Sequence, residues 1–168
     1  AICYLDEVVE ARQDTVVVLH PLTDYRRMLP IDKTGETIEA APGFQLVVSY
    51  NPGYQRMLKD LKPSTRQRFV ALDFDFPPLD TEVAIVEREG AANHATAHAL
   101  VTLGRRLRGL QERGLAEVPS TRLLSAAARL IASGIPERDA CMAAIVSPLS
   151  DEATLVGAMH DLVDASFI

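Results

Sequence analysis

Two consecutive prolines, Pro77 and Pro78, divide the chain into two halves with different sequence patterns. Proline lacks a backbone N–H and restricts the residue before it, so a connecting segment is expected there. Before the prolines, short apolar runs alternate with turn residues, which is typical of strands and short helices. After them, apolar residues recur with a period of about 3.6 residues, as in helices. We therefore expect an α/β piece at residues 1–78 and an all-helical piece at residues 79–168.

Short apolar or alternating runs predict the strands of the α/β piece. They lie at residues 2–5, 44–49 and 70–76. Gly35, near the tip of residues 27–40, has β-branched flanks and predicts a hairpin there. Helices are expected at residues 8–22 and 64–69, with Ser64 as the N-cap of the second helix.

The all-helical piece is expected to hold five helices, at residues 79–89, 93–113, 121–133, 137–146 and 151–165. Residues suited to begin helices accompany these patterns, because their side chains can accept a backbone hydrogen bond: Asp80, Asn93, Ser120 and Ser150. Residues suited to end helices follow the first three patterns: Gly90, Gly114 and Gly134.

Charge and composition limit the classes of function. The net charge of −6 disfavours bulk electrostatic binding to nucleic acid or to an anionic membrane. No apolar run reaches the ~20 residues of a membrane span. Cys3 and Cys141 lie in apolar runs, which is typical of buried reduced thiols and fits a cytoplasmic protein. His94 and His98 have a spacing that can bind a metal, but no third ligand accompanies them in the sequence.

The first predicted strand ends in two adjacent carboxylates, Asp6 and Glu7. In that position one carboxylate can hold a water bound to Mg2+, and the next can orient an attacking water. The alternative is structural, because acidic residues at a helix N-terminus interact favourably with the helix macrodipole. The two residues alone leave both interpretations open.

Polar residues that could meet a phosphate occur further along the chain. Asn51 follows the second predicted strand, where ligands bind in open α/β sheets, although Asn-Pro-Gly is also an ordinary turn. Arg66 and Arg68 precede the third predicted strand and could reach a phosphate on a neighbouring subunit, or they are solvated surface charges. Arg122 lies in the first turn of a predicted helix, where a cation is electrostatically unfavourable, and this indicates an anionic partner.

The order of these segments resembles that of a known family. The sequence AICYLDE leads into EVVEARQDTVVVLHPL, then RRMLPIDKTGE, VVSYNPGYQ and STRQRF, and finally STRLL in the helical piece. Nearly the whole chain resembles the CbbQ/NorQ/GvpN group of MoxR-type AAA+ ATPases, with VVSYNPGYQ and STRQRF as the most specific parts. The resemblance implies the C-terminal part of a AAA+ P-loop core, a parallel sheet with helices, at residues 1–78. An all-α lid subdomain at residues 79–168 would follow it.

The resemblance also implies roles for three residues near the ends of the strands. Asp6 and Glu7 match the Walker B acids, with Asp6 on the Mg2+ side and Glu7 polarising the hydrolytic water. Asn51 matches the sensor 1 position. The implied cofactors are therefore ATP and Mg2+, and the hairpin at residues 27–40 matches an insertion near the pore of a ring.

Three arginines receive roles in the same way. Arg68 matches the arginine finger, with Arg66 as the near alternative, and Arg122 matches the sensor 2 arginine of the lid. No stretch matches the phosphate-binding loop G-x-x-x-x-G-K-[ST]. We therefore expect this chain to be the C-terminal part of a longer protein and, on its own, to bind nucleotide poorly.

The function implied by the resemblance is that of an ATP-hydrolysing motor subunit in a homo-hexamer. Such a motor remodels or activates a metabolic enzyme together with a partner protein that carries a von Willebrand factor A domain. The implied clients are Rubisco and nitric oxide reductase, a third branch serves gas vesicles, and the sequence does not choose among them. The rival interpretation is a non-catalytic adaptor or scaffold domain, or a degenerate ring subunit. A phosphate-binding loop upstream would favour the motor over the rival.

Overall fold

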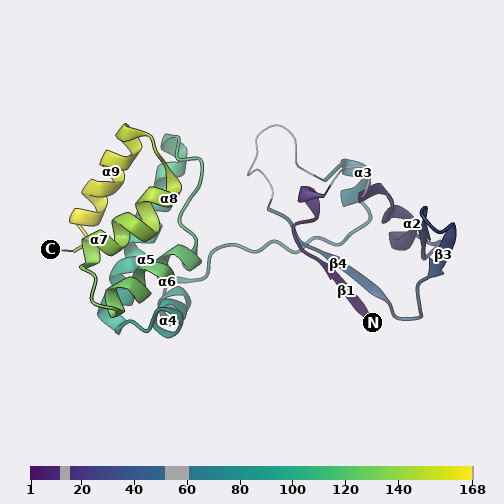
Figure 1. Ribbon diagram of the computed structural model, residues 1–168, viewed down its shortest axis with the longest axis horizontal. Coiled ribbons are helices and arrows are strands. Elements are labelled where there is room, and N and C mark those ends of the chain that lie inside the picture. The colour runs from purple at the N-terminus through teal and green to yellow at the C-terminus, as the bar shows by residue number, and fades with distance from the viewer. Residues whose placement is uncertain (12–15, 52–60, 168) are drawn as a thin grey trace. The chain divides into compact units, whose positions relative to one another are not determined.

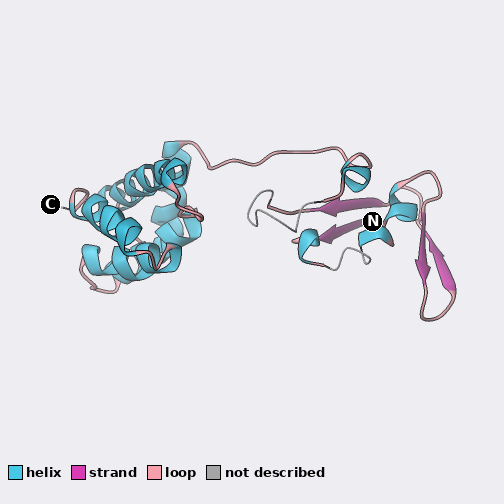
Figure 2. Cartoon of the chain, turned by 90° about the horizontal axis from the view of Figure 1, so that it is seen from above, coloured by secondary structure: helices cyan, strands magenta, loops and turns pink. Residues whose placement is uncertain are grey.

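The computed structural model describes residues 1–11, 16–51 and 61–167 of the chain. The chain forms two compact units, Ala1–Asp73 and Phe74–Ile168. The first unit contains the strands among the described residues, and the second is helical (Figures 1 and 2). This confirms the predicted fold class, an α/β portion followed by an all-α portion. The domain bounds 1–78 and 79–168 stay a prediction.

A short parallel sheet lies at the start of the first unit. Strand β1 (Ile2–Leu5) pairs with β4 (Gln45–Val48), and the register runs in parallel from Ile2 opposite Gln45 to Leu5 opposite Val48. Figure 1 shows the two strands side by side. The prediction of strands at residues 2–5 and 44–49 is thus confirmed, and their carboxyl ends meet at one edge of the sheet.

The predicted hairpin is also present. Strand β2 (Met28–Ile31) pairs antiparallel with β3 (Glu36–Glu39), and the connecting turn contains Gly35 at a φ of 71°. Glycine enters this left-handed region without steric penalty, which explains why the turn can close there. β3 is exposed along its whole length.

The predicted continuous helix at residues 8–22 is wrong. A single 3-10 turn, η1 (Val8–Glu10), ends at Ala11, whose backbone is extended at φ −68° and ψ 156°. A separate helix, α2 (His20–Thr23), follows, with Pro21 in its first turn. Proline is tolerated there because a backbone N–H in the first turn has no hydrogen-bond partner within the helix. Residues 16 and 17 are helical as predicted, but a turn at residues 18 and 19 separates them from α2, and residues 12–15 lie outside the described part of the chain. Apolar periodicity did not reveal this turn or the extended backbone at Ala11.

The short helix predicted at residues 64–69 is present as α3 (Pro63–Arg66), but its N-cap is Lys62 and not Ser64. Pro63 has a φ already suited to a first helical position, so the helix begins one residue before the predicted cap. No side-chain capping bond forms at this end.

The strand predicted at residues 70–76 is wrong. This segment has no regular secondary structure, and its apolar side chains are exposed, with Val70 at 93%, Leu72 at 79% and Phe74 at 93%. Alternating apolar and acidic residues suit a strand, but a strand also needs a neighbour for its backbone hydrogen bonds. Among the described residues, β1 and β4 pair with each other and with no third strand.

The second unit consists of helices packed around one core. Each predicted helical segment is present, some as two consecutive elements. They are α4 (Leu79–Gly90), α5 (His94–Arg108), the 3-10 helix η2 (Gly109–Arg113), α6 (Thr121–Ala132), α7 (Glu137–Cys141), the π-helix η3 (Met142–Val146), α8 (Ser147–Leu149) and α9 (Ala153–Asp164). None of the described helices combines the length and the apolar character that crossing a bilayer requires.

Side chains cap two of these helices as predicted. Asn93 accepts a hydrogen bond from the Thr96 amide at 2.9 Å, and Ser120 accepts one from the Leu123 amide at 3.4 Å. Asp80 and Ser150 are not N-caps, because α4 begins directly after Pro78 and α9 begins after Glu152. The Ser150 hydroxyl instead accepts a hydrogen bond from the Glu152 amide at 3.1 Å.

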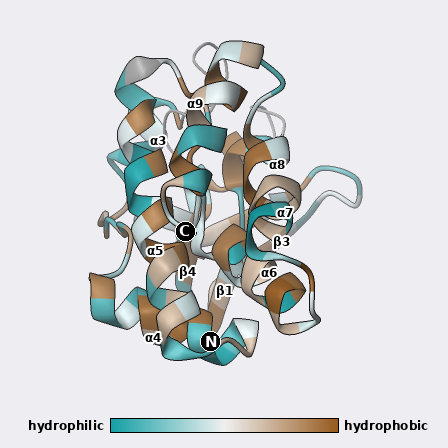
Figure 3. Cartoon of the chain, turned by 90° about the vertical axis from the view of Figure 1, so that its left-hand side faces the viewer, coloured by the Kyte–Doolittle hydropathy of each residue, from teal (hydrophilic) through white to brown (hydrophobic). Residues whose placement is uncertain are grey.

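The core of the second unit is apolar and tightly packed. Its largest fully buried apolar side chains come from α5, α6, η3 and α9 and from the segment before α6: Leu100, Leu103, Leu107, Leu115, Leu124, Ile145 and Met159. Helices α4, α5 and α6 each carry hydrophobic and hydrophilic stretches, as Figure 3 shows. Burial of the hydrophobic faces is the main favourable term in forming this bundle.

Candidate active site

The chain turns sharply where β1 ends, and the two predicted acids lie in this turn. The Ser49 amide donates to the Leu5 carbonyl at 3.0 Å, and the Val8 amide donates to the Ser49 carbonyl at 3.0 Å. Between these bonds Glu7 adopts φ 48° and ψ 44°, the left-handed region that residues other than glycine rarely enter. Such a conformation costs about 1–3 kcal/mol and is found most often at functional sites.

Asp6 is held by side chains from both strands. The Ser49 hydroxyl donates a short hydrogen bond to Asp6 Oδ1, and the Tyr4 hydroxyl approaches the same oxygen at 2.9 Å. The Glu7 amide donates to Ser49 Oγ at 3.3 Å, which fixes the serine in turn. The hydrogen bond from Ser49, and then the one from Tyr4, lower the pKa of Asp6 below its usual value. Asp6 is therefore an anion at neutral pH.

This arrangement fits a magnesium ion held mainly by water and substrate. Mg2+ prefers oxygen ligands and is usually bound through one or two carboxylates while it keeps several waters. Within the described residues, the hydrogen bonds to Asp6 end on Oδ1 and none is formed to Oδ2, which suits a metal-bound water. A cluster of three or more His, Cys, Asp or Glu side chains is absent from residues 1–11, 16–51 and 61–167. His94 instead pairs with Glu87, at 2.5 Å.

The structural alternative for Glu7 receives no support from the geometry. Glu7 does occupy the N-cap position of η1, but its side chain forms no capping hydrogen bond. The helix itself is only three residues long, so its dipole is small. Glu7 is exposed at the end of the strand, where it can meet a solvent molecule.

Ser49 is a residue of this site that the sequence analysis missed. It was counted only as the last residue of a predicted strand. Register could have found it, because Leu5 lies opposite Val48 and the next residues, Asp6 and Ser49, must then be neighbours. Asn51 follows two residues later and is exposed at the same edge of the sheet, whereas Pro52 and Gly53 lie outside the described residues.

Arg68 lies just after α3 and belongs to a different cluster. Its Nη1 atom is 3.7 Å from Asp24 Oδ2, and Arg26 forms a bidentate pair with the same carboxylate at 2.7 and 3.0 Å. The hydrogen bond from Arg26 is the largest effect that lowers the pKa of Asp24 to about 2. In the described part of the chain, no hydrogen bond or ion pair joins Arg68 to Asp6 or Glu7. Its role and that of Arg66, the last residue of α3, stay predictions.

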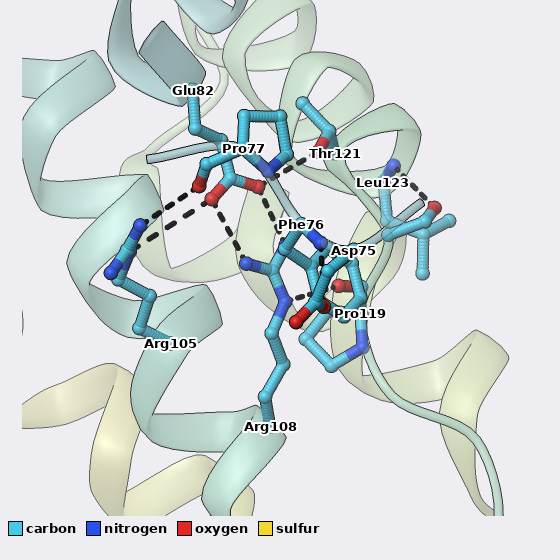
Figure 4. Close-up of polar contacts among 10 residues, drawn as sticks. Asp75, Phe76, Pro77, Glu82, Arg105, Arg108, Pro119, Thr121 and Leu123 are labelled. Carbon is cyan, nitrogen blue, oxygen red and sulfur yellow. Dashed lines mark hydrogen bonds and ion pairs between the residues drawn. The ribbon is translucent and has the colours of Figure 1, made fainter. Parts of the chain in front are cut away.

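Arg122 is the second residue of α6 in the helical unit, and its side chain is exposed. The residue before it, Thr121, belongs to a buried polar network around Glu82, which Figure 4 shows together with Arg105 and Arg108. The sequence analysis missed this network, although Glu82 lies four residues before the apolar Val86, a spacing that places an acid on an apolar helix face. The predicted contact of Arg122 with a nucleotide stays a prediction.

Comparison with known proteins identifies the class of each half of the chain. Residues 1–69 match the AAA domain (dynein-related subfamily), which agrees with a parallel sheet that delivers acids at its edge. Residues 82–166 match the domain described as CbbQ/NirQ/NorQ C-terminal. The protein is thus a AAA-domain protein with a helical C-terminal portion. It belongs to the CbbQ/NirQ/NorQ family, as the resemblance in sequence predicted.

Similar full-length proteins come from several bacteria. The chain is 58% identical over 166 residues to the denitrification regulatory protein NirQ of Stutzerimonas stutzeri, covering 99% of this chain and 60% of the relative. It is 58% identical over 167 residues to protein NorQ of Paracoccus denitrificans, covering 99% and 62%. Protein CbbQ of Hydrogenophilus thermoluteolus is 54% identical over 167 residues, with the same coverage of 99% and 62%. The chain therefore spans less than two thirds of the length of these relatives.

Proposed function

We propose that the full-length protein is an ATP-hydrolysing AAA+ motor subunit that uses ATP and Mg2+. The observation that carries this proposal is the corner after β1. There Asp6 is kept ionised by Ser49 and Tyr4, and Glu7 is exposed from a left-handed backbone conformation. Two acids arranged in this way suit metal binding and water activation better than they suit helix capping. Membership of the AAA domain class supports the same chemistry.

In this proposal each acid has one task. Asp6 orients a water of the magnesium shell, and Mg2+ when bound neutralises charge on the phosphates. Glu7 accepts a proton from the attacking water as the water oxygen bonds to the terminal phosphorus and the bond from that phosphorus to the leaving ADP oxygen breaks. Asn51, at the same edge, orients that water or the phosphate by hydrogen bonding.

The arginines supply positive charge to the same reaction in the proposal. Arg68, or Arg66 beside it, reaches the nucleotide of a neighbouring subunit, which requires a ring such as a homo-hexamer. Arg122 contacts the phosphates from the helical lid. A cation placed against the developing charge of the transferred phosphoryl group stabilises the transition state.

We also propose that the motor activates a metabolic enzyme in the cytoplasm together with a partner that carries a von Willebrand factor A domain. The proposed client is nitric oxide reductase or Rubisco. A similar protein is named a denitrification regulatory protein, which supports the nitrogen-oxide client. A relative named CbbQ at comparable identity supports Rubisco as the second candidate client.

The test is substitution of Glu7 by glutamine in the full-length protein. Glu7→Gln keeps the shape of the side chain but removes the base, so ATP should still bind while hydrolysis falls by about 100-fold or more. Glu117→Gln, the same change at an exposed position in the helical unit, serves as the control and should hydrolyse ATP normally. Binding is measured by calorimetry and turnover by phosphate release.

Two outcomes would count against the motor. Normal turnover in the Glu7→Gln protein would remove the assigned base. A full-length wild-type protein that fails to bind ATP would favour the non-catalytic adaptor or scaffold, the rival interpretation of the sequence.

A further inference from the structure

Glu82 is a fully buried carboxylate in the first turn of α4. Its Oε1 atom accepts hydrogen bonds from Arg108 at 2.6 Å and from the Thr121 hydroxyl at 2.8 Å. Its Oε2 atom accepts a second hydrogen bond from Arg108, at 2.9 Å, and Arg105 lies 4.0 Å away. Both oxygens are therefore satisfied by partners that come from two other helices, α5 and α6 (Figure 4).

The carboxylate is charged at neutral pH. Burial alone raises the pKa of Glu82, but hydrogen bonds from Arg108 and Thr121 and the charges of Arg108 and Arg105 outweigh burial and hold the pKa below its usual value. A buried pair of opposite charges seldom stabilises a protein more than a well-packed apolar pair would. Such a network can still fix the relative positions of the groups that it joins, because hydrogen bonds are directional.

Arg108 and Arg105 link three further places to this carboxylate. Its Nε atom donates to the Pro119 carbonyl at 2.9 Å, and its guanidinium carbon lies 3.6 Å from the centre of the Phe76 ring. Arg105 donates to the Pro77 carbonyl at 3.0 Å. The end of the connecting segment, Phe76–Pro77, is thus fastened to α5 by two arginines.

The same network holds the start of α6 from two sides. Arg108 binds the carbonyl of Pro119 just before the N-cap residue, Ser120, and Glu82 binds the hydroxyl of Thr121 just after it. Arg122 follows Thr121 directly and has its backbone in the same helical turn. Any movement of this turn would displace Arg122.

We propose that Glu82, Arg108 and Thr121 are positioning residues that hold the first turn of α6, and with it Arg122, in a fixed relation to Phe76–Pro77. They act through Arg122, so the inference rests on the proposed function, in which Arg122 contacts the phosphates of ATP. Loss of the network would leave the arginine present but misplaced, and misplacement of a charged group lowers transition-state stabilisation.

The experiment measures ATP hydrolysis by the full-length protein with changes at residue 121, in the presence and absence of Arg122. Thr121→Val removes the hydroxyl with little change of shape and should lower kcat/KM for ATP by about fivefold, within the range for coupled neighbours. Thr121→Ser keeps the hydroxyl and should restore the wild-type value. In a protein that already carries Arg122→Ala, Thr121→Val should cause no further loss.

A matched control is Thr154→Val, the same change at an exposed position in the first turn of α9, which should leave kcat/KM unchanged. Additive losses from Thr121→Val and Arg122→Ala would overturn the proposal, because Thr121 would then act independently of Arg122. Wild-type activity of the Thr121→Val protein, or normal activity of the Arg122→Ala protein, would overturn it as well.

A second readout separates this inference from the proposed function. The Leu123 and Leu124 amides both bond to the Ser120 carbonyl, at 3.0 and 3.3 Å, so their hydrogen exchange reports on the first turn of α6. Thr121→Val should accelerate exchange there and leave α9 unchanged. A wild-type protein without ATPase activity would refute the proposed function, whereas unchanged exchange in the Thr121→Val protein would refute the network's hold on α6.

Discussion

The Cys141 thiol shows how surroundings control a single reactive group. It is fully buried at the end of α7, and burial, with a smaller effect of Glu137, raises its pKa to about 12. Cys3 on β1 is only partly buried. The thiolate is the reactive form of cysteine, so the two residues should differ in reactivity although both are free thiols.

We predict that iodoacetamide at pH 8 modifies Cys3 and leaves Cys141 unmodified in the folded full-length protein. Peptide mass spectrometry measures the labelling at each site. In urea both cysteines should be labelled, which controls for peptide recovery. Equal labelling rates in the native protein would show that Cys141 is reached by solvent.

At the scale of the helix, α4 and α6 approach each other closely at Gly90. A Cβ atom placed on Gly90 would lie 2.3 Å from the Ala128 Cβ, a distance that requires the helices to move apart. Gly157 on α9 has no atom within 4 Å of its equivalent position. The two glycines therefore have different physical reasons to be present.

We predict that Gly90→Ala lowers the free energy of unfolding by about 1–3 kcal/mol, as overpacking does, despite the better helix propensity of alanine. Gly157→Ala makes the same change without a clash and should be neutral or stabilising by up to about 1 kcal/mol. Urea denaturation followed by circular dichroism measures both. A Gly90→Ala protein as stable as the wild type would indicate that α4 and α6 can separate at little cost.

Secondary structure was predictable from the sequence where local chemistry decides it. The strand at β1, the hairpin and the helices of the second unit follow from apolar periodicity, and the caps Asn93 and Ser120 follow from side-chain chemistry. The structure of residues 70–76 was not predictable in this way, because alternating apolar and acidic residues do not supply a neighbouring strand to pair with. In the site, the adjacent acids were visible, and strand register could have added Ser49. The polar network of Glu82 was not predictable, because its partners Arg108 and Thr121 lie far from it in the sequence.

At the scale of the whole molecule, the proposed function requires more than one copy of the protein. Arg68 lies 3.7 Å from Asp24 of its own chain, whereas Arg26 binds the same carboxylate at 2.7 Å and is its main partner. A phosphate on a neighbouring subunit would therefore compete readily for this guanidinium. The site would then be shared between two subunits.

We predict that Arg68→Ala lowers ATP turnover of the assembled full-length protein by about 1000-fold while nucleotide binding to the monomer persists. Mixing Arg68→Ala subunits with Glu7→Gln subunits should recover part of the activity, since some interfaces then combine an intact Glu7 with an intact Arg68. Phosphate release from mixtures of defined ratio measures this. Loss of monomer binding in the Arg68→Ala protein, or no recovery on mixing, would show that Arg68 does not act between subunits.

The left-handed backbone at Glu7 affects how the thermostability of this protein can be increased. Glycine would suit that turn better than any other residue, yet glycine carries no carboxylate. Foldability and chemistry thus make opposing demands on one position. A search for more thermostable variants would tend to select against the acid there, and the variants it favoured would lose the carboxylate to which the proposed function assigns activation of water.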